Sequence, residues 1–279
     1  MHFSLRTSCS LLLLATAAAL PATAGIERSL DQTFNVAPGS IVKVDVSGCS
    51  IRTTVGPAGT ARVVLKQKFG TNNAAEADKL LERYEILCTQ QGDEVKLAVK
   101  QKGGFGFQWG FGDRVQFAPE ITLPADVRLN LDTSGGSITI AGEMTAAVWA
   151  DTSGGSIKAD GGLDLNLDTS GGSIHVRRAL GHLHANTSGG GITVDFVGPG
   201  ATAVTLDTSG GSIRAEVDPT AKLDVVADTS GGSVQVDGFA AFVVEKKERA
   251  HVSGRLNGGG GTLRADTSGG SIRITAATP

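Results

Sequence analysis

The chain has 279 residues, a formal net charge of −3, and 39 glycines against only 8 prolines. Near neutrality, with acids and bases interspersed, argues against the basic face of a nucleic-acid binder, so we expect no nucleic-acid partner. Abundant glycine without matching proline or a three-residue period excludes collagen and indicates many tight turns.

Residues 1–24 are typical of a secretory signal peptide. Arg6 precedes an apolar run from Leu11 to Leu20, and an Ala-x-Ala pattern ends at Ala24. The run is shorter than the roughly 20 residues that cross a bilayer, so we expect export without a transmembrane anchor; a retained membrane anchor is the alternative. Periplasm, cell surface and external medium all fit this prediction.

Residues 25–124 are predicted to form an N-terminal cap. Asp45 to Ile51 is a faint copy of a later repeat and predicts a strand pair that joins or caps it. Ala, Glu, Lys and Leu at helical spacing predict a helix over Ala74–Tyr84, with Asn73 as its N-cap. Residues 85–89 and 95–99 predict a hairpin.

Two cysteines follow the predicted signal peptide, Cys49 and Cys88. In an exported protein an isolated pair indicates a disulfide more often than a metal or redox site. Cys88 lies on the predicted hairpin, so a bridge would tie the hairpin to the strand pair; free thiols are the alternative.

Four aromatic residues alternate with small and polar ones in a glycine-rich segment: Phe105, Phe107, Trp109 and Phe111. Such a segment fits a contact with a glycan, a membrane or another subunit. It fits equally a cover over the open end of the repeat core, which is the role we favour. The segment is still the first place where we expect a binding surface.

Residues 125–279 are dominated by one motif, first complete at Asp132-Thr133-Ser134-Gly135-Gly136-Ser137-Ile138. Apolar residues stand one and three positions before each copy, and again at its seventh and ninth positions. This period of two is typical of half-buried strands. A degenerate Val252-Ser253-Gly254 is interpreted as an extra coil in the long last interval. The copies begin at Asp132, Asp151, Asp168, Asn186, Asp207, Asp228 and Asp266.

One copy, made of a strand, a corner, a strand and a return loop, cannot bury its apolar side alone. Stacking copies about 4.8 Å apart closes their backbone hydrogen bonds and builds a shared aliphatic interior. Parallel crossovers are nearly always right-handed. We therefore predict an all-β fold, a right-handed parallel β-solenoid of roughly 20-residue coils with the cap described above. A β-propeller would need blades of roughly 40 residues.

The corner residues suggest structural roles. Glycine is needed where the chain turns with positive φ or passes close to the next coil. The aspartate column is expected to accept hydrogen bonds from turn amides. Ca²⁺ binding is the alternative, although the calcium-binding repeat places its acid after the glycines and has about half this period. Thr133 and its equivalents are expected to point inward.

Catalytic and metal sites find weak support. His182 and His184 are expected to share an outward face with Asp164 and Asn166, where a metal site is conceivable. Without a third ligand, ordinary solvent-facing histidines are the interpretation we favour. Polysaccharide lyases and hydrolases on β-helices place two acids around a sugar bond and interrupt their repeat for a cleft. This repeat is regular throughout. We expect no catalytic residues, no cofactor and no metal.

The repeats, in their order with the flanking segments, resemble a bacterial family of "putative adhesin" domains. The resemblance covers roughly residues 30–275. It rests on Thr33 to Val36, on Val46 to Gly48, on Pro119 to Pro124, on the repeats and on Gly254 to Gly260. It implies a fold and an adhesin-like role, and it supplies no catalytic residues. Cys49 departs from the glycine of the motif, which supports a bridge particular to this chain.

We therefore expect a non-catalytic, exported, adhesin-like binding or scaffolding protein of the bacterial cell envelope or surface. A cell-surface glycan or an envelope protein is the expected partner, and uncovered solenoid ends favour homo-oligomers. Two alternatives stay open. One is a carbohydrate-active lyase or hydrolase, and the other is an envelope structural or signalling component acting through protein partners.

Overall fold

A computed structural model describes residues 25–102 and 115–278 of the chain. The predicted signal peptide, residues 1–24, lies outside the described residues. So do Phe105, Phe107, Trp109 and Phe111.

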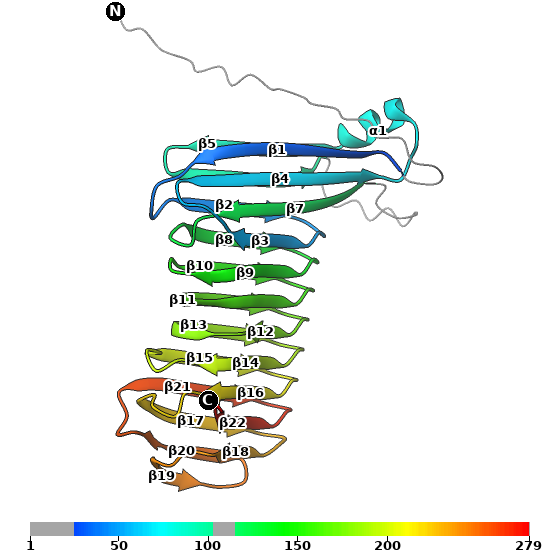
Figure 1. The fold of residues 1–279 in the computed structure, drawn as a ribbon. Coiled ribbons are helices and arrows are strands. Elements are labelled where there is room, and N and C mark those ends of the chain that lie inside the picture. The colour runs from blue at the N-terminus through cyan, green and yellow to red at the C-terminus, as the bar shows by residue number, and fades with distance from the viewer. Residues whose placement is uncertain (1–24, 103–114, 279) are drawn as a thin grey trace, which may run out of the picture.

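The described part is nearly all β, which confirms the predicted all-β class; it has 22 strands and one helix (Figure 1). The helix is α1 (Ala74–Leu81). The strands are β1 (Glu27–Asn35), β2 (Ile41–Val46), β3 (Ile51–Val55), β4 (Thr60–Phe69), β5 (Tyr84–Gln91), β6 (Glu94–Gln101), β7 (Val115–Leu123), β8 (Arg128–Thr133), β9 (Ile138–Met144), β10 (Val148–Thr152), β11 (Ile157–Thr169), β12 (Ile174–Val176), β13 (Ala179–Thr187), β14 (Ile192–Val197), β15 (Ala203–Thr208), β16 (Ile213–Val217), β17 (Leu223–Thr229), β18 (Val234–Asp237), β19 (Phe242–Lys247), β20 (His251–Leu256), β21 (Gly261–Thr267) and β22 (Ile272–Ala276).

Two parallel ladders run along the molecule, one on each side of the Ser-Gly-Gly corners. The first ladder joins the strands that precede a corner, in the order β6, β2, β8, β10, β11, β13, β15, β21 and β17. The second joins those that follow, in the order β7, β3, β9, β11, β12, β14, β16, β22 and β18. Equivalent motif positions pair in register, so each corner lies beside the next.

The aliphatic columns predicted from the repeat fill the space between the ladders. Leu129 and Leu131 before the first corner, and Ile138 and Ile140 after it, are at most 1% exposed. Equivalent positions in the other copies are also buried, except that Val236 at the end of the second ladder is half-buried. Period-two alternation thus predicted correctly which side chains face inward.

The order of the last layers differs from the order along the chain. β21 lies between β15 and β17, and β22 lies between β16 and β18 (Figure 1). The chain therefore skips one layer after β16 and fills it with its C-terminal strands. Asn257, in the loop between β20 and β21, donates hydrogen bonds to the carbonyls of Pro219 and Ala221, both at 2.8 Å. These bonds join that loop to the one between β16 and β17.

The extra coil predicted at Val252-Ser253-Gly254 is wrong. These residues belong to β20, which pairs antiparallel with both β17 and β19. The segment extends the first ladder beyond the last corner because the chain reverses direction there instead of repeating the corner.

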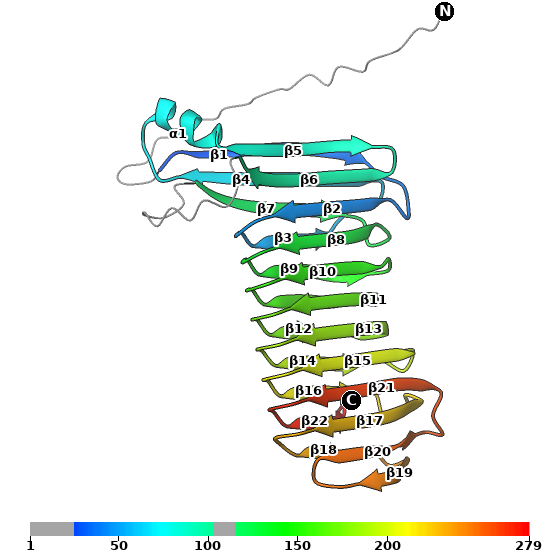
Figure 2. The same cartoon turned by 180° about the vertical axis from the view of Figure 1, so that it is seen from behind.

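The N-terminal elements extend the opposite end of both ladders. β4 pairs antiparallel with β7, and β1 with β4, whereas β5 pairs antiparallel with β6 (Figure 2). The predicted hairpin is confirmed as β5 and β6. Helix α1 starts at its predicted N-cap, Asn73, whose side chain accepts hydrogen bonds from two backbone amides. The helix ends at Leu81, before the predicted end at Tyr84, because Tyr84 begins β5. The Tyr84 ring packs edge-on against Phe117, with 4.9 Å between the ring centroids.

Candidate binding surface

The corner between the ladders is built by a threonine at the second motif position. Thr152 Oγ1 donates to the carbonyl of Gly136 in the preceding layer at 2.8 Å and accepts from the amide of Gly155 in its own layer at 3.3 Å. The bond to the preceding layer recurs in all seven copies. The prediction that these threonines point inward is confirmed, and each hydroxyl joins two layers.

The fifth motif position must be glycine because neighbouring backbones nearly touch there. A Cβ on Gly155 would lie 2.0 Å from the carbonyl oxygen of Gly136. The preceding glycine, Gly154, has room, since its nearest neighbour would be 3.6 Å away. None of the corner glycines after residue 130 has positive φ. Of the two predicted reasons for glycine, close approach is the one that applies.

The aspartates form one outward column in register along the first ladder. Within the described residues no turn amide donates to these carboxylates, so the predicted turn-amide role is wrong, because the threonine hydroxyl already bonds the corner. In spatial order the column is Asp45, Asp132, Asp151, Asp168, Asn186, Asp207, Asp266 and Asp228.

Several of these side chains have charged or polar partners. Lys100 pairs with Asp45 at 3.0 Å, Arg264 with Asp266 at 2.6 Å, and His251 with Asp228 at 2.6 Å. Asn186 donates to the Asp168 carboxylate at 2.9 Å.

The carboxyls of Asp132 and Asp151 lie in the middle of the acidic run. Partial burial, and then the neighbouring carboxylates, raise the pKa of each above its ordinary value. For Asp151 these neighbours are Asp132 and Asp168, one on either side. Lys100 opposes the rise in the pKa of Asp132, whereas the charged neighbours of Asp151 are both acidic.

The described part of the chain contains no cluster of three or more His, Cys, Asp or Glu that could hold a metal ion. Asp164 lies beside His182 and Asn166 beside His184, as predicted, with no third ligand in that cluster. Side chains from parallel strands project side by side, so the aspartate column does not converge on one point either.

The predicted Cys49–Cys88 disulfide is not formed, and both thiols are free. Cys88 pairs with Leu97, which in turn pairs with Val44, so Cys88 is two strands away from β2, or about 9.6 Å. Cys49 lies five residues beyond Val44, whereas a bridge needs Cα atoms within about 7 Å. Burial raises the pKa of each thiol to about 11.

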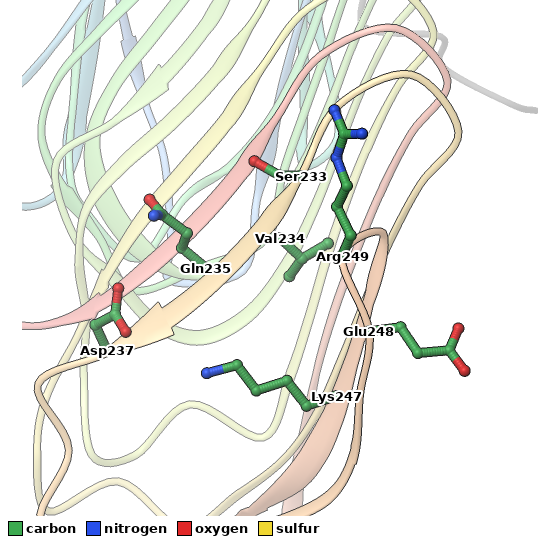
Figure 3. Close-up of a pocket in the computed structure, with 7 residues that line it drawn as sticks. All are labelled: Ser233, Val234, Gln235, Asp237, Lys247, Glu248 and Arg249. Carbon is green, nitrogen blue, oxygen red and sulfur yellow. The ribbon is translucent and has the colours of Figure 1, made fainter.

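A shallow hollow lies at the end of the stack opposite the N-terminal strands, where the second ladder stops at β18 and the first continues into β20 and β19. Its volume is about 470 Å³, and Figure 3 shows Lys247 extending toward the side of Asp237 while Glu248 points the other way. The lining contains no aromatic ring and no convergent pair of acids. It is lined by Ser233, Val234, Gln235, Asp237, Lys247, Glu248 and Arg249.

An exposed indole on the first ladder was missed by sequence reasoning. Trp149 of β10 is 40% exposed, between Asn130 of β8 and Asn166 of β11. The signal was present, since Trp149 occupies a column position that is otherwise mostly polar: Asn130, Asn166, His184, Thr205 and Arg264.

Comparison with known proteins gives a family match. The model of the Toastrack DUF4097 family matches residues 121–275. No curated protein matches the chain. In the described part, no helix is long and apolar enough to cross a membrane.

The chain is also similar to solved structures with 12% sequence identity and TM-scores below 0.5. A "putative adhesin" from Bacteroides fragilis has a TM-score of 0.44 and covers 88% of this chain and 97% of its own. One from Parabacteroides merdae has a TM-score of 0.43, with 90% and 97% covered. A "putative lipid binding protein" from Parabacteroides distasonis has a TM-score of 0.41, with 88% and 96% covered. Similarity at this level carries no argument about fold or function.

Proposed function

The chain belongs to the Toastrack DUF4097 family, and from this premise we propose that it is a non-catalytic, exported, adhesin-like binding or scaffolding protein of the bacterial envelope or surface. Its body is a right-handed parallel β-solenoid with an N-terminal cap. The partner is a cell-surface glycan or an envelope protein.

One observation carries the proposal: the outward side chains stand in straight columns on a support that is tied together at every corner. Each threonine bridges two layers, and equivalent strand positions pair in register. Such a support holds surface groups at a constant spacing of about 4.8 Å, which suits multivalent contact with an extended partner.

Export is tested by expressing the full chain in a bacterial host and fractionating the cells. We expect a protein that starts after Ala24 in the periplasm, at the surface or in the medium. Full-length protein confined to the cytoplasm would contradict the proposal.

Binding is tested with purified, labelled protein on bacterial cells, isolated envelopes and immobilised polysaccharides. We expect saturable binding to at least one surface and no release of reducing sugar. Sugar release would favour the carbohydrate-active alternative. Absence of binding to every surface would overturn the adhesive role.

The ends of the stack support self-association. β1, β5, β18 and β19 each pair with a single strand in the described structure, so each keeps one open edge. Open edges favour pairing with another chain. We expect the mass measured by light scattering to rise with protein concentration, and a monomer at all concentrations would exclude association through these ends.

A further inference from the structure

We propose that the outward face of β8, β10 and β11 around Trp149 is a binding site for a neutral saccharide, with a sugar ring stacked on the indole. The inference rests on the proposed function and names a ligand class for it. It places recognition on the side of the stack, along the first ladder.

The strand register places Trp149 within a flat grid of outward side chains. Asn130 and Asn166 flank it on the two neighbouring strands, and Asp151 lies two residues further along its own strand. Asp132 and Asp168 flank Asp151 in the same way. The indole is therefore bordered on three sides by amide and carboxylate groups.

These groups are available to a ligand. Neither the amides of Asn130 and Asn166 nor the indole N–H of Trp149 has a hydrogen-bond partner among the described residues. Each amide supplies two donors and an acceptor, and Asp151 supplies acceptors. Hydroxyl groups of a sugar require this mixture, because each of them both donates and accepts.

The indole supplies the apolar part of the contact. Its face is electron-rich, and the C–H groups on one face of a pyranose ring present the complementary positive edge. Among the large apolar side chains that are exposed in the described structure, Trp149 is the aromatic one; the others are Leu87, Leu163, Val243 and Val244.

The isolation of the ring favours a saccharide over a protein partner. Protein contact sites gather several apolar side chains into a patch of a few hundred Å². Here the outward neighbours of the ring in register are polar or charged. A ligand that is apolar over one ring and hydroxylated at its rim matches this pattern.

The acidic column restricts the class of sugar. Asp132, Asp151 and Asp168 stand on adjacent strands at about 4.8 Å spacing. They would repel uronates and sialylated sugars, so we expect neutral saccharides to bind in preference to acidic ones.

The test measures binding of cellohexaose, mannohexaose, xylohexaose and hexagalacturonate to the purified full-length protein by calorimetry. The matched variants are Trp149→Ala at the site and Leu87→Ala on β5, whose side chain is equally exposed at 40%, with circular dichroism to verify folding. We expect at least one neutral hexasaccharide to bind and hexagalacturonate to fail. Trp149→Ala should weaken binding about tenfold or more, which is about 1.4 kcal/mol, and Leu87→Ala should leave it unchanged.

A Trp109→Phe background makes Trp149 the single tryptophan of the chain, so its fluorescence reports the site directly. We expect titration with the neutral sugar to change this fluorescence, with the same dissociation constant as calorimetry gives. Unchanged fluorescence on binding, or equal affinity of Trp149→Ala and the parent, would overturn the site.

Cell binding separates this inference from the proposed function. Protein that binds envelopes but none of the three neutral hexasaccharides would overturn the saccharide site and leave the adhesive role standing. Protein that binds a hexasaccharide through Trp149 but no cell surface would overturn the adhesive role and leave the site standing. Failure of both measurements would overturn both proposals.

Discussion

Two residues of the motif are explained by a single contact at the corner. The fifth position brings its backbone against the preceding layer, and the second position donates a hydroxyl to the same carbonyl. The early copy between β2 and β3 has Val46 and Cys49 at these two positions, so it lacks both the hydroxyl and the glycine.

Gly155→Ala should lower the free energy of unfolding by about 3 kcal/mol, because its Cβ would lie 2.0 Å from a backbone oxygen that is held in a ladder. Gly154→Ala is the matched control, with its nearest contact at 3.6 Å, and should change stability by less than about 1 kcal/mol. Urea unfolding measures both. Equal losses in the two variants would contradict the close-approach explanation.

Two buried threonines should respond in opposite directions to replacement by valine. Thr152→Val removes a hydroxyl that bonds two backbone groups and should cost about 1–2 kcal/mol. Thr53 is 1% exposed and its hydroxyl has no partner, so Thr53→Val should stabilise the protein by about 1 kcal/mol. Thermal and urea unfolding compare the pair, and a loss of stability in Thr53→Val would show that its hydroxyl is bonded.

At the scale of elements, the two ladders share one pattern in the middle and differ at their ends. Antiparallel strands continue the first ladder into β20 and β19, whereas the second ends at β18. The C-terminal strands fill an interior layer, so the end of the chain is not the end of the stack. The stability of β17, β18 and the strands beyond them should therefore depend on β21 and β22.

Engineered disulfides test the order of these layers. Thr205 pairs in register with Arg264, so Thr205→Cys with Arg264→Cys should cross-link under oxidation. Val226 is separated from Thr205 by β21, at about 9.6 Å, so Thr205→Cys with Val226→Cys should stay reduced. Non-reducing electrophoresis and peptide mass spectrometry detect the bridges. The reverse outcome would mean that layers stack in chain order.

At the scale of the whole molecule, one acidic column runs almost the full length of the stack. Lys100 and Arg264 form ion pairs near its two ends, His251 lies within hydrogen-bond distance of Asp228, and Asn186 interrupts it. Around Asp151 the neighbouring carboxylates repel one another. This repulsion destabilises the folded state, because the layers hold the carboxylates side by side. The pH dependence of folding should report this repulsion.

Asp151→Asn should stabilise the protein by about 1 kcal/mol at pH 7, which is the repulsion expected from neighbours at this spacing in water. The pKa of Asp151 is raised in the folded state, so its contribution to stability is fully present below its ordinary pKa of 3.8 and is lost as pH rises through the folded value. The advantage of the variant should therefore vanish below that pH.

Urea unfolding at pH 7 and at low pH measures this difference, and Asn186→Asp is the reverse control. That change extends the acidic run and removes the hydrogen bond to Asp168, so it should lower stability at pH 7. A gain that is independent of pH in Asp151→Asn would point to packing instead of charge.

Local patterns in the sequence were sufficient for much of the fold. Period-two alternation identified the buried columns, Asn73 marked the start of the helix, and the hairpin strands followed from their own residues. These features depend on neighbours in the chain. The binding surface was less accessible, because an exposed Trp149 becomes a candidate only when Asn130 and Asn166 are seen beside it.

By itself the sequence determined which side chains face the interior, since that choice repeats every second residue and needs no knowledge of distant segments. Only the tertiary structure decided which layers touch, which hydroxyl bonds the corner, and how far apart Cys49 and Cys88 lie. The reason is that the copies at Asp207, Asp228 and Asp266 carry the same motif. Any order of them satisfies the local pattern equally well, and the loops and long-range pairings select one.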